Sequence, residues 1–314
     1  MSPEATHLDD AVSDQRGLVV PSLSAGEVLC AHLSKLRDEL RACDALVHRF
    51  APDSVHQMRI ATRQLRSALA TFRPLLVRES TELVRFDLGW LGGLLGLVRD
   101  AEVERQRLAK LVANESAELV IGPVAERLDA HFAVIYRNAH HQVLEALNSA
   151  RYLKLLEELD ILVGELPLKS AAAELAEEAM PKLVRRDWER LSRAFAAAEH
   201  APPGPLRDLF LHETRKAAKR TRYSAEAVIP VVGRRAEKFA RAAKKLQTLL
   251  GEHHDSVEFR AVLLQVAAEA HLDGQDSFTY GRLHAIEQAH AEGIEKQLSM
   301  TWSRIAARHR HWMR

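Results

Sequence analysis

The chain has 314 residues, of which 47% are hydrophobic and 28% charged, and this composition is ordinary for a soluble globular protein. The formal net charge is only +1, so clusters of basic residues must be balanced by acids elsewhere in the chain. No run of residues approaches the roughly 18 apolar positions that a membrane span requires. We therefore expect a cytoplasmic protein that can bury one substantial core or two smaller ones.

The two cysteines, Cys30 and Cys43, are thirteen positions apart on one predicted helix. They would be separated by about 20 Å along the helix axis, which is too far for a disulfide and fits a reducing compartment. Residues 1–23 carry several acids and lack the apolar core of a signal peptide. We expect a disordered leader over these residues.

The first helical unit opens with two predicted helices. Between residues 25 and 50 apolar side chains recur at spacings of three and four, which is typical of a helix with one buried face. Pro52 interrupts this pattern, and Asp53 or Ser54 is placed to cap the next helix. Pro74 limits that second helix to the residues before it.

Glycine and aspartate mark the later boundaries of this first unit, which covers residues 24–165. Gly96 is placed to end a third helix over 81–95, and Asp100 can cap the helix that follows. The remaining helices of the unit are expected over 101–112, 124–147 and 152–164.

The second unit, residues 170–308, follows the same plan. A proline-rich break at 202–205 separates two predicted helices, and Pro230 with Gly233 ends the second of them. Gly251 and Asp255 repeat the stop and the cap of the first unit. No stretch alternates polar and apolar residues with a period of two, so no strand is predicted. The helices of this unit are expected over 171–198, around residue 212, and over 235–250, 257–270 and 278–308.

The two units repeat one pattern of basic residues. A constant offset of 156 pairs His56 with His212, Arg59 with Arg215, Arg63 with Lys219 and Arg66 with Arg222. The Leu-Gly and Asp positions at 95–100 recur at an offset of 155. A tandem repeat of this length predicts an all-α fold, in which two antiparallel helical bundles are related by a pseudo-twofold axis.

On a helix, the four repeated positions of each unit fall within a stripe roughly 80° wide. A single basic stripe is usually a solvated face, but two diverged copies that keep one register favour an anion-binding groove between the units. The histidines can either contact the ligand or pack against a neighbouring helix, and the sequence leaves this choice open. A second stripe, about 60° wide, is formed by Arg234, Lys238, Arg241 and Lys245.

The length of these basic faces favours an extended polyanion over a single nucleotide, which would need one helix N-terminus or a glycine-rich loop. Aromatic residues make up only 5% of the chain, and single-stranded nucleic acids are normally bound by stacking on aromatic side chains. We therefore favour a polymer that carries charge and lacks bases. Nucleic-acid binding and a phosphate- or metal-dependent hydrolase are the alternatives.

The motifs that carry these stripes resemble the CHAD domain family. In the first unit they read His-Gln-Met-Arg-Ile-Ala-Thr-Arg-Gln-Leu-Arg-Ser at 56–67 and Leu-Gly-Leu-Val-Arg-Asp at 95–100; in the second they are residues 212–223 and 246–255. The resemblance covers residues 24 to 308. It implies two helical bundles around a basic channel that binds inorganic polyphosphate. Association with polyphosphate granules or with a second copy of the chain is a further expectation.

The candidate polyphosphate-binding residues are the two repeated stripes and neighbouring basic positions. The two walls are expected to differ in charge, because Glu82 stands where the second unit has Lys238, and Gly89 where it has Lys245. The full candidate set is His56, Arg59, Arg63, Arg66, Arg85, His212, Arg215, Lys216, Lys219, Arg222, Arg234, Lys238, Arg241 and Lys245.

The sequence contains no recognisable constellation for catalysis. The Glu-Val-Glu-Arg-Gln string at 102–106 lacks the lysine of the tunnel hydrolases that often accompany the family. A di-metal bundle needs two Glu-x-x-His pairs, and only one is found, Glu287 with His290. A Walker loop and a nucleophile elbow are both missing. We therefore expect a binding protein without catalytic residues, metal or cofactor.

Overall fold

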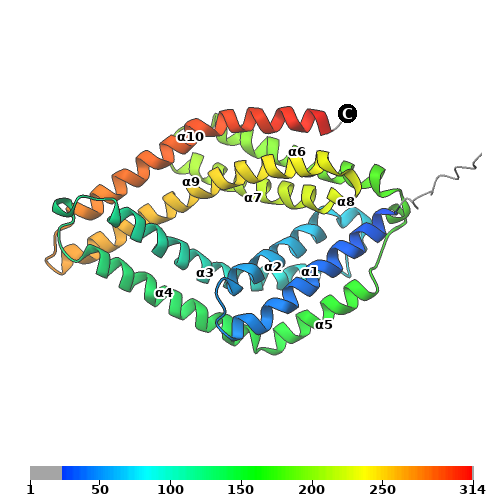
Figure 1. Ribbon diagram of the computed structural model, residues 1–314, viewed down its shortest axis with the longest axis horizontal. Coiled ribbons are helices and arrows are strands. Elements are labelled where there is room, and N and C mark those ends of the chain that lie inside the picture. Colours follow the sequence, from blue (N-terminus) through cyan, green and yellow to red (C-terminus); the bar gives the residue numbers. More distant parts are fainter. Residues whose placement is uncertain (1–22, 313–314) are drawn as a thin grey trace, which may run out of the picture.

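The protein is almost entirely helical between residues 23 and 312, the part of the chain that this computed structural model describes (Figure 1). Within that part the only strand-like pairings are two isolated bridges, Ser24 with Leu175 and Leu76 with Leu168. The predicted all-α class is therefore confirmed. The leader expected over residues 1–23 lies outside the described residues except for Leu23. None of the described helices combines the length and apolarity needed to cross a membrane.

The helices of the first half lie close to the predicted positions. Its two single-turn 3-10 helices are η1 (Arg73–Leu75), just after the second helix, and η2 (Ala117–Leu119). The α-helices are α1 (Ala25–His48), α2 (Ser54–Thr71), α3 (Glu82–Ala113), α4 (Val124–Leu147) and α5 (Ala150–Gly164).

The second half follows a short connection that contains η3 (Ser170–Ala173). The proline-rich break at 202–205 separates α6 from α7, as expected from the sequence. The α-helices are α6 (Ala176–His200), α7 (Pro205–Ala227), the single turn α8 (Ile229–Val232), α9 (Arg234–Leu272) and α10 (Phe278–Trp312).

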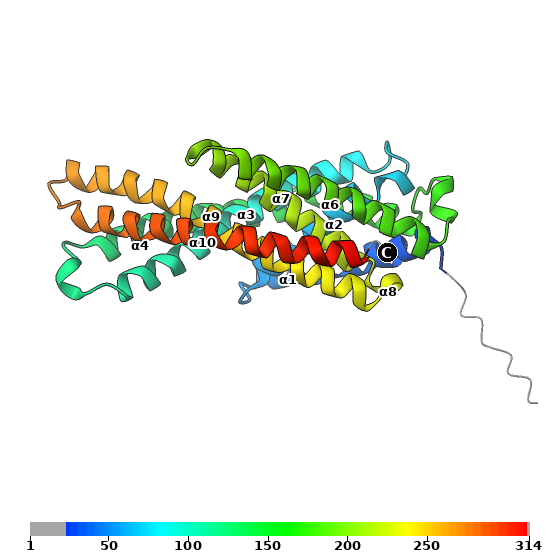
Figure 2. The same cartoon turned by 90° about the horizontal axis from the view of Figure 1, so that it is seen from above.

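Figure 1 shows α1–α5 on one side of an elongated molecule and α6–α10 on the other. In the first half α1 packs on α2, α2 on α3 and α3 on α4; in the second, α6 packs on α7, α7 on α9 and α9 on α10. The same order of helices is therefore found in both halves, while the sequence repeat itself stays a prediction. The halves meet mainly where α2 lies against α7 and α1 against α6. Seen from above, α3 and α4 extend to the same end of the molecule as α9 and α10 (Figure 2).

Two predicted helix boundaries are wrong. α3 continues through Gly96 and Asp100, and α9 continues through Gly251 and Asp255. Neither glycine has the positive φ angle of a helix C-cap. The glycines and aspartates instead face the arginines of the preceding helix, as described below. Each pair of helices predicted on the two sides of the glycine is therefore one long helix.

The residue predicted to cap α2 is correct, but its side chain does not form a capping hydrogen bond with the backbone. Asp53 is the N-cap residue, but it adopts a left-handed conformation with a φ of 62° and its side chain makes no capping hydrogen bond. Its carboxylate accepts a hydrogen bond from Gln57 Nε2 at 2.8 Å instead. The carboxylate therefore stabilises the first turn of α2 through a side chain rather than through the backbone.

Buried apolar side chains form two clusters. The main cluster contains residues from both halves, including Leu29 of α1, Met58 of α2 and Leu246 of α9. A small cluster joins α3 and α4 to α9 and α10. In it the rings of Phe132 and Phe259 are stacked, with their centroids 6.0 Å apart. Its buried members are Leu108, Val124, Leu128, Phe132, Phe259, Leu263, Val266, Ala270, Tyr280 and Leu283.

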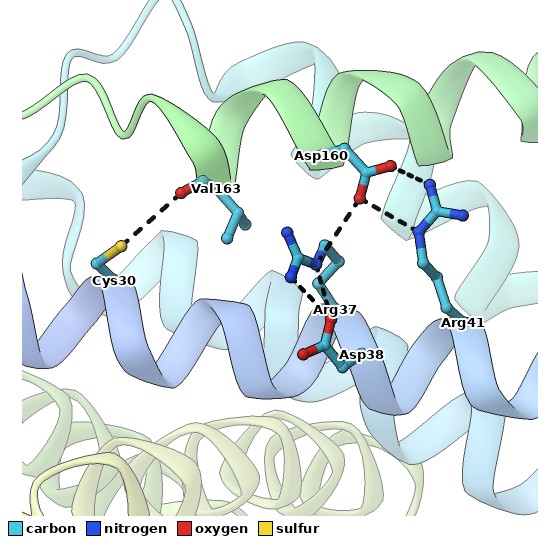
Figure 3. A network of polar contacts seen from close by, with 6 residues as sticks. All are labelled: Cys30, Arg37, Asp38, Arg41, Asp160 and Val163. Atoms are coloured by element: carbon cyan, nitrogen blue, oxygen red, sulfur yellow. Dashed lines mark hydrogen bonds and ion pairs between the residues drawn. The ribbon is translucent and has the colours of Figure 1, made fainter.

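Polar contacts fix α1 against α5 at the edge of the first half (Figure 3). The guanidinium groups of Arg37 and Arg41 both reach the Asp160 carboxylate, with Arg41 Nε at 3.2 Å. Cys30 lies nearby with its Sγ 3.8 Å from the Val163 carbonyl oxygen. Cys30 and Cys43 are both free thiols, as the sequence predicts.

Two interior ion pairs help to position the halves, the first between the halves and the second within the second half. Arg107 of α3 holds the Glu287 carboxylate of α10 with both nitrogens of its fork, and Nε lies 2.7 Å from Oε1. Arg220 of α7 lies 2.6 Å from Oδ1 of the buried Asp187 on α6. The same arginine reaches α2, because its Nη2 donates to the Ala70 carbonyl oxygen at 2.8 Å. Each pair therefore contributes to the position of one half against the other.

Candidate anion-binding site

Four basic side chains of the predicted stripes come together where α2 faces α7. We call them the central cluster: Arg59 and Arg63 on α2, and Arg215 and Lys219 on α7. Burial, reinforced by the charges of the other three members, lowers the pKa of Lys219 to about 6. Burial also lowers the pKa of Arg63 to about 10, with Arg59 and Arg215 acting in the same direction. The fold thus brings together four basic side chains whose positive charges repel one another.

Two members of the central cluster have acidic partners in matched positions. Arg59 Nη2 lies 3.0 Å from Asp100 Oδ1, and Arg215 Nη2 lies 3.3 Å from Asp255 Oδ1. These aspartates are the residues that the sequence assigned to helix caps. Neither Arg63 nor Lys219 has an ion pair among the described residues. Within the described part of the chain, the cluster therefore keeps two partly buried basic side chains that no carboxylate contacts.

Gly96 and Gly251 lie beneath the paired arginines. A Cβ at Gly96 would stand 3.8 Å from Arg59 Nε, and one at Gly251 would stand 3.8 Å from Arg215 Nε. Any side chain longer than a methyl group would compete with the guanidinium for this space. The buried Nε–H groups of both arginines also lack a hydrogen-bond acceptor among the described residues.

The two predicted histidines lie at the ends of the stripes and are held differently. Burial lowers the pKa of His56, and the charges of Arg99 and Arg59 act in the same direction. His212 contacts His254 with Nδ1 atoms 3.1 Å apart, and burial together with this neighbour lowers the pKa of His212 to about 4. Both imidazoles face neighbouring helices α3 and α9 while bordering the central cluster.

Arg66 and Arg222 extend the stripes beyond the central cluster. The guanidinium of Arg66 lies over Gly89, where a Cβ would come within 3.3 Å of its Cζ. Arg222 is tied more firmly, because its Nε lies 2.8 Å from Glu226 Oε1 and its Nη1 donates to Gln247 Oε1 at 3.0 Å. Arg66, with no ion pair among the described residues, remains available to an anion.

Two other predicted residues on these faces are held by nearby acids. Arg85 Nη1 donates to Glu82 Oε1 at 2.8 Å, so Glu82 neutralises part of the positive charge on this face. Lys216 is exposed and pairs with Glu213 at 2.7 Å.

The second predicted stripe lies in a different place from the central cluster. Lys238, Arg241 and Lys245 of α9 line a hollow of about 910 Å³ between α9 and the end of α10. Arg235, Arg304 and Arg308 line the same hollow, and no acid is present among the described residues of its lining. Arg234 is exposed at the first residue of α9 and is not part of the lining. The structure therefore divides the predicted residues between two basic surfaces.

Acidic side chains border the central cluster on α3 and α9. Burial, together with the charges of Glu258, Asp100 and Asp255, raises the pKa of Glu104 to about 7. Sequence reasoning missed these acids as neighbours of the site because it ended a helix at each glycine. Helical spacing from Asp100 to Glu104 and from Asp255 to Glu258 would have revealed them on uninterrupted helices.

Tyr223 is another neighbour of the site that the sequence did not reveal as a member. Its ring lies under the guanidinium of Arg222 at 4.9 Å, and the charges of Arg222, Arg63 and Arg59 partly offset the rise in its pKa that burial causes. The residue directly follows a stripe position in the sequence, but only the approach of α2 to α7 places it beside Arg63.

In the central cluster, two facing helices bring four basic side chains together. Each half contributes a matched arginine–aspartate pair. The CHAD domain model matches residues 31–264, and the chain belongs to the CHAD domain family.

The chain is also similar to two curated proteins. Two proteins of Mycobacterium tuberculosis, Uncharacterized protein MT2285 (strain CDC 1551 / Oshkosh) and Uncharacterized protein Rv2226 (strain ATCC 25618 / H37Rv), are each 38% identical over 269 residues. Those matches cover 85% of this chain and 50% of each relative, so the chain spans about half of their length.

The fold is similar to PptA from Streptomyces chartreusis, with a TM-score of 0.73 and 24% identity over 89% of this chain and 99% of that one. It is also similar to the CHAD domain from the plant Ricinus communis, with a TM-score of 0.69 and 22% identity over 91% of this chain and 93% of that one.

Proposed function

We propose that this protein binds inorganic polyphosphate at the central cluster and does not catalyse its turnover. The observation that carries the proposal is the pair of partly buried basic side chains, Arg63 and Lys219, that have no ion pair among the described residues. A charge without a partner in this site is costly at Arg63, and the same cost shifts Lys219 towards its neutral form. An anion placed between α2 and α7 would stabilise the charged form of both side chains. The CHAD family resemblance supports polyphosphate as the anion.

The distribution of basic residues supports an extended ligand. Arg66 and the two histidines continue the central cluster along α2 and α7, so successive phosphates can meet successive side chains. Arginine forks bind two phosphate oxygens at once, while a lysine acts as a point charge. Association with polyphosphate granules would follow from such binding and belongs to this proposal.

The first measurement is equilibrium binding of long-chain polyphosphate across a salt series. If the four cations of the central cluster release counterions from the chain, log affinity should fall linearly with log salt with a slope of about −3 or steeper, by analogy with single-stranded nucleic acids. RNA at equal charge should compete weakly, and no orthophosphate should be released in the presence of Mg²⁺. Displacement by RNA at comparable charge would favour the nucleic-acid alternative, and metal-dependent phosphate release would favour a hydrolase.

Binding should also take up protons, because Lys219 has a pKa of about 6 in the free protein. Arg59 and Arg63 on α2 and Arg215 on its own helix disfavour its charge, while Asp255 on α9 favours it. A bound polyanion stabilises the charged amine and raises its pKa. At pH 7.5 we therefore expect Lys219 to take up close to one proton, and affinity to fall as pH rises above 6.

Calorimetric titration in buffers of different ionisation enthalpy measures this uptake. Lys219→Arg keeps the positive charge but carries it already in the free protein, so its proton uptake should be lower by nearly one. Lys216→Arg, at the exposed lysine that pairs with Glu213, is the matched control and should behave like the wild type. The same uptake in Lys219→Arg as in the wild type would show that Lys219 does not titrate with the ligand.

A further inference from the structure

A histidine and two carboxylates meet on three helices of the second half. They are Asp208 in the first turn of α7, His253 in the middle of α9 and Glu295 on α10. His253 Nε2 lies 3.3 Å from Glu295 Oε1 and 3.6 Å from Asp208 Oδ1. One potential ligand atom from each of the three residues lies within 4.8 Å of the other two.

These distances match the separation between two ligand atoms of one bound metal ion. Zinc lies about 2.0–2.2 Å from nitrogen and oxygen ligands in a tetrahedron, whose edges are therefore roughly 3.3–3.6 Å. The two measured edges at His253 have this length before any ligand moves. One imidazole with two carboxylates is a donor set that suits zinc and neighbouring divalent transition metals, whereas Mg²⁺ and Ca²⁺ prefer oxygen alone.

Burial and a neighbouring cation position the three side chains for metal binding. His253 is only 2% exposed, while Asp208 and Glu295 are each 25% exposed, so the site is covered by the protein on one side and reachable from the other. Arg207 lies with its Nε 2.8 Å from Glu295 Oε2, which leaves Oε1 directed at the histidine. A second partner that orients a ligating carboxylate in this way is common around protein-bound metals.

The first half of the chain shows that the shared fold does not require this set. At the offset of 155 that relates Asp100 to Asp255, His253 corresponds to Val98, a fully buried apolar residue of the main cluster. A buried imidazole between two acids is therefore a specific feature of the second half.

We propose that Asp208, His253 and Glu295 bind one divalent transition-metal ion, of the zinc class. The bound ion would link the start of α7 to α9 and α10, and so hold the second half's side of the central cluster. The proposal is independent of polyphosphate binding, because it concerns other side chains and its test uses no polyphosphate.

The test uses untagged full-length protein that has been treated with a chelator and dialysed. Addition of Zn²⁺ should raise the midpoint of thermal unfolding, and equilibrium dialysis should retain one Zn²⁺ per chain. Co²⁺ should give the intense visible absorption of a four-coordinate site. Mg²⁺ at the same concentration should leave the midpoint unchanged.

His253→Val installs the residue found at the corresponding position of the first half, and it should lower Zn²⁺ affinity at least tenfold and abolish the Co²⁺ absorption. Glu295→Gln, which retains the shape of the side chain, should weaken binding in the same direction if the valine variant does not fold. His141→Ala removes an exposed histidine paired with Glu145 and should bind Zn²⁺ like the wild type. A wild-type midpoint that ignores Zn²⁺, or full retention of Zn²⁺ by both site variants, would overturn the proposal.

Discussion

Charge reversal at Arg63 is expected to weaken polyphosphate binding roughly a hundredfold, which is typical when a buried charge loses its partner. Arg63→Glu removes a cation that has no acidic partner among the described residues and places a carboxylate against Arg59, Arg215 and Lys219. The new carboxylate would take the place of a phosphate. Equilibrium binding at fixed salt and pH measures the change.

Arg137→Glu is the matched control, because Arg137 lies exposed on α4 and forms no ion pair among the described residues. Its affinity should stay within about threefold of the wild type, since surface charges contribute little at physiological salt. Arg127 is a poorer control, because it already pairs with Asp273. Equal losses at Arg63 and Arg137 would mean that polyphosphate responds to net charge rather than to the central cluster.

Removal of Arg220 is expected to have the largest effect on stability. Arg220→Ala leaves Asp187, whose side chain is 3% exposed, without its guanidinium partner, and truncation of a buried pair costs about 3–5 kcal/mol. Thr71 still donates to the carboxylate at 2.6 Å, which places the expected loss near 3 kcal/mol, the lower end of that range. Denaturant unfolding of the variant and the wild type measures this difference.

Two comparisons identify the uncompensated charge as the cause. Arg185→Ala, also a change in the second half, removes an exposed pair with Glu189 and should alter stability by no more than about 0.5 kcal/mol. The double variant Arg220→Met/Asp187→Leu removes both charges and should recover most of the loss, because apolar side chains often replace a buried ion pair without cost. A double variant as unstable as Arg220→Ala would assign the loss to packing or to the contact with Ala70.

Local patterns were sufficient to predict most of the helices. α4 begins and ends at the residues expected from its apolar spacing, and the breaks at Pro52, Pro74 and the proline-rich stretch at 202–205 are present. Gly96 and Gly251 were misread, because a glycine that ends a helix and one that admits a crossing side chain look alike in sequence. Only the partner helix distinguishes them, through Arg59 and Arg215.

The candidate site was predictable in register but not in extent. The offset of 156 paired Arg63 with Lys219, and the fold places both in one cluster. Helical periodicity showed that Lys238 and Lys245 share a face, but the direction of that face depends on the rotation of α9 against α7 and α10. That rotation is set by tertiary packing, so the sequence did not separate the α9–α10 hollow from the central cluster.

The small apolar cluster can be completed only late in the synthesis of the protein. Residues 108–132 emerge from the ribosome well before residues 259–283, which complete the cluster. Until then Leu128 and Phe132, both fully buried in the finished protein, lack the six buried members of the cluster that α9 and α10 contribute. The end of the α3–α4 hairpin therefore keeps exposed apolar surface during synthesis until α9 and α10 pack against it, and such surface is prone to aggregation.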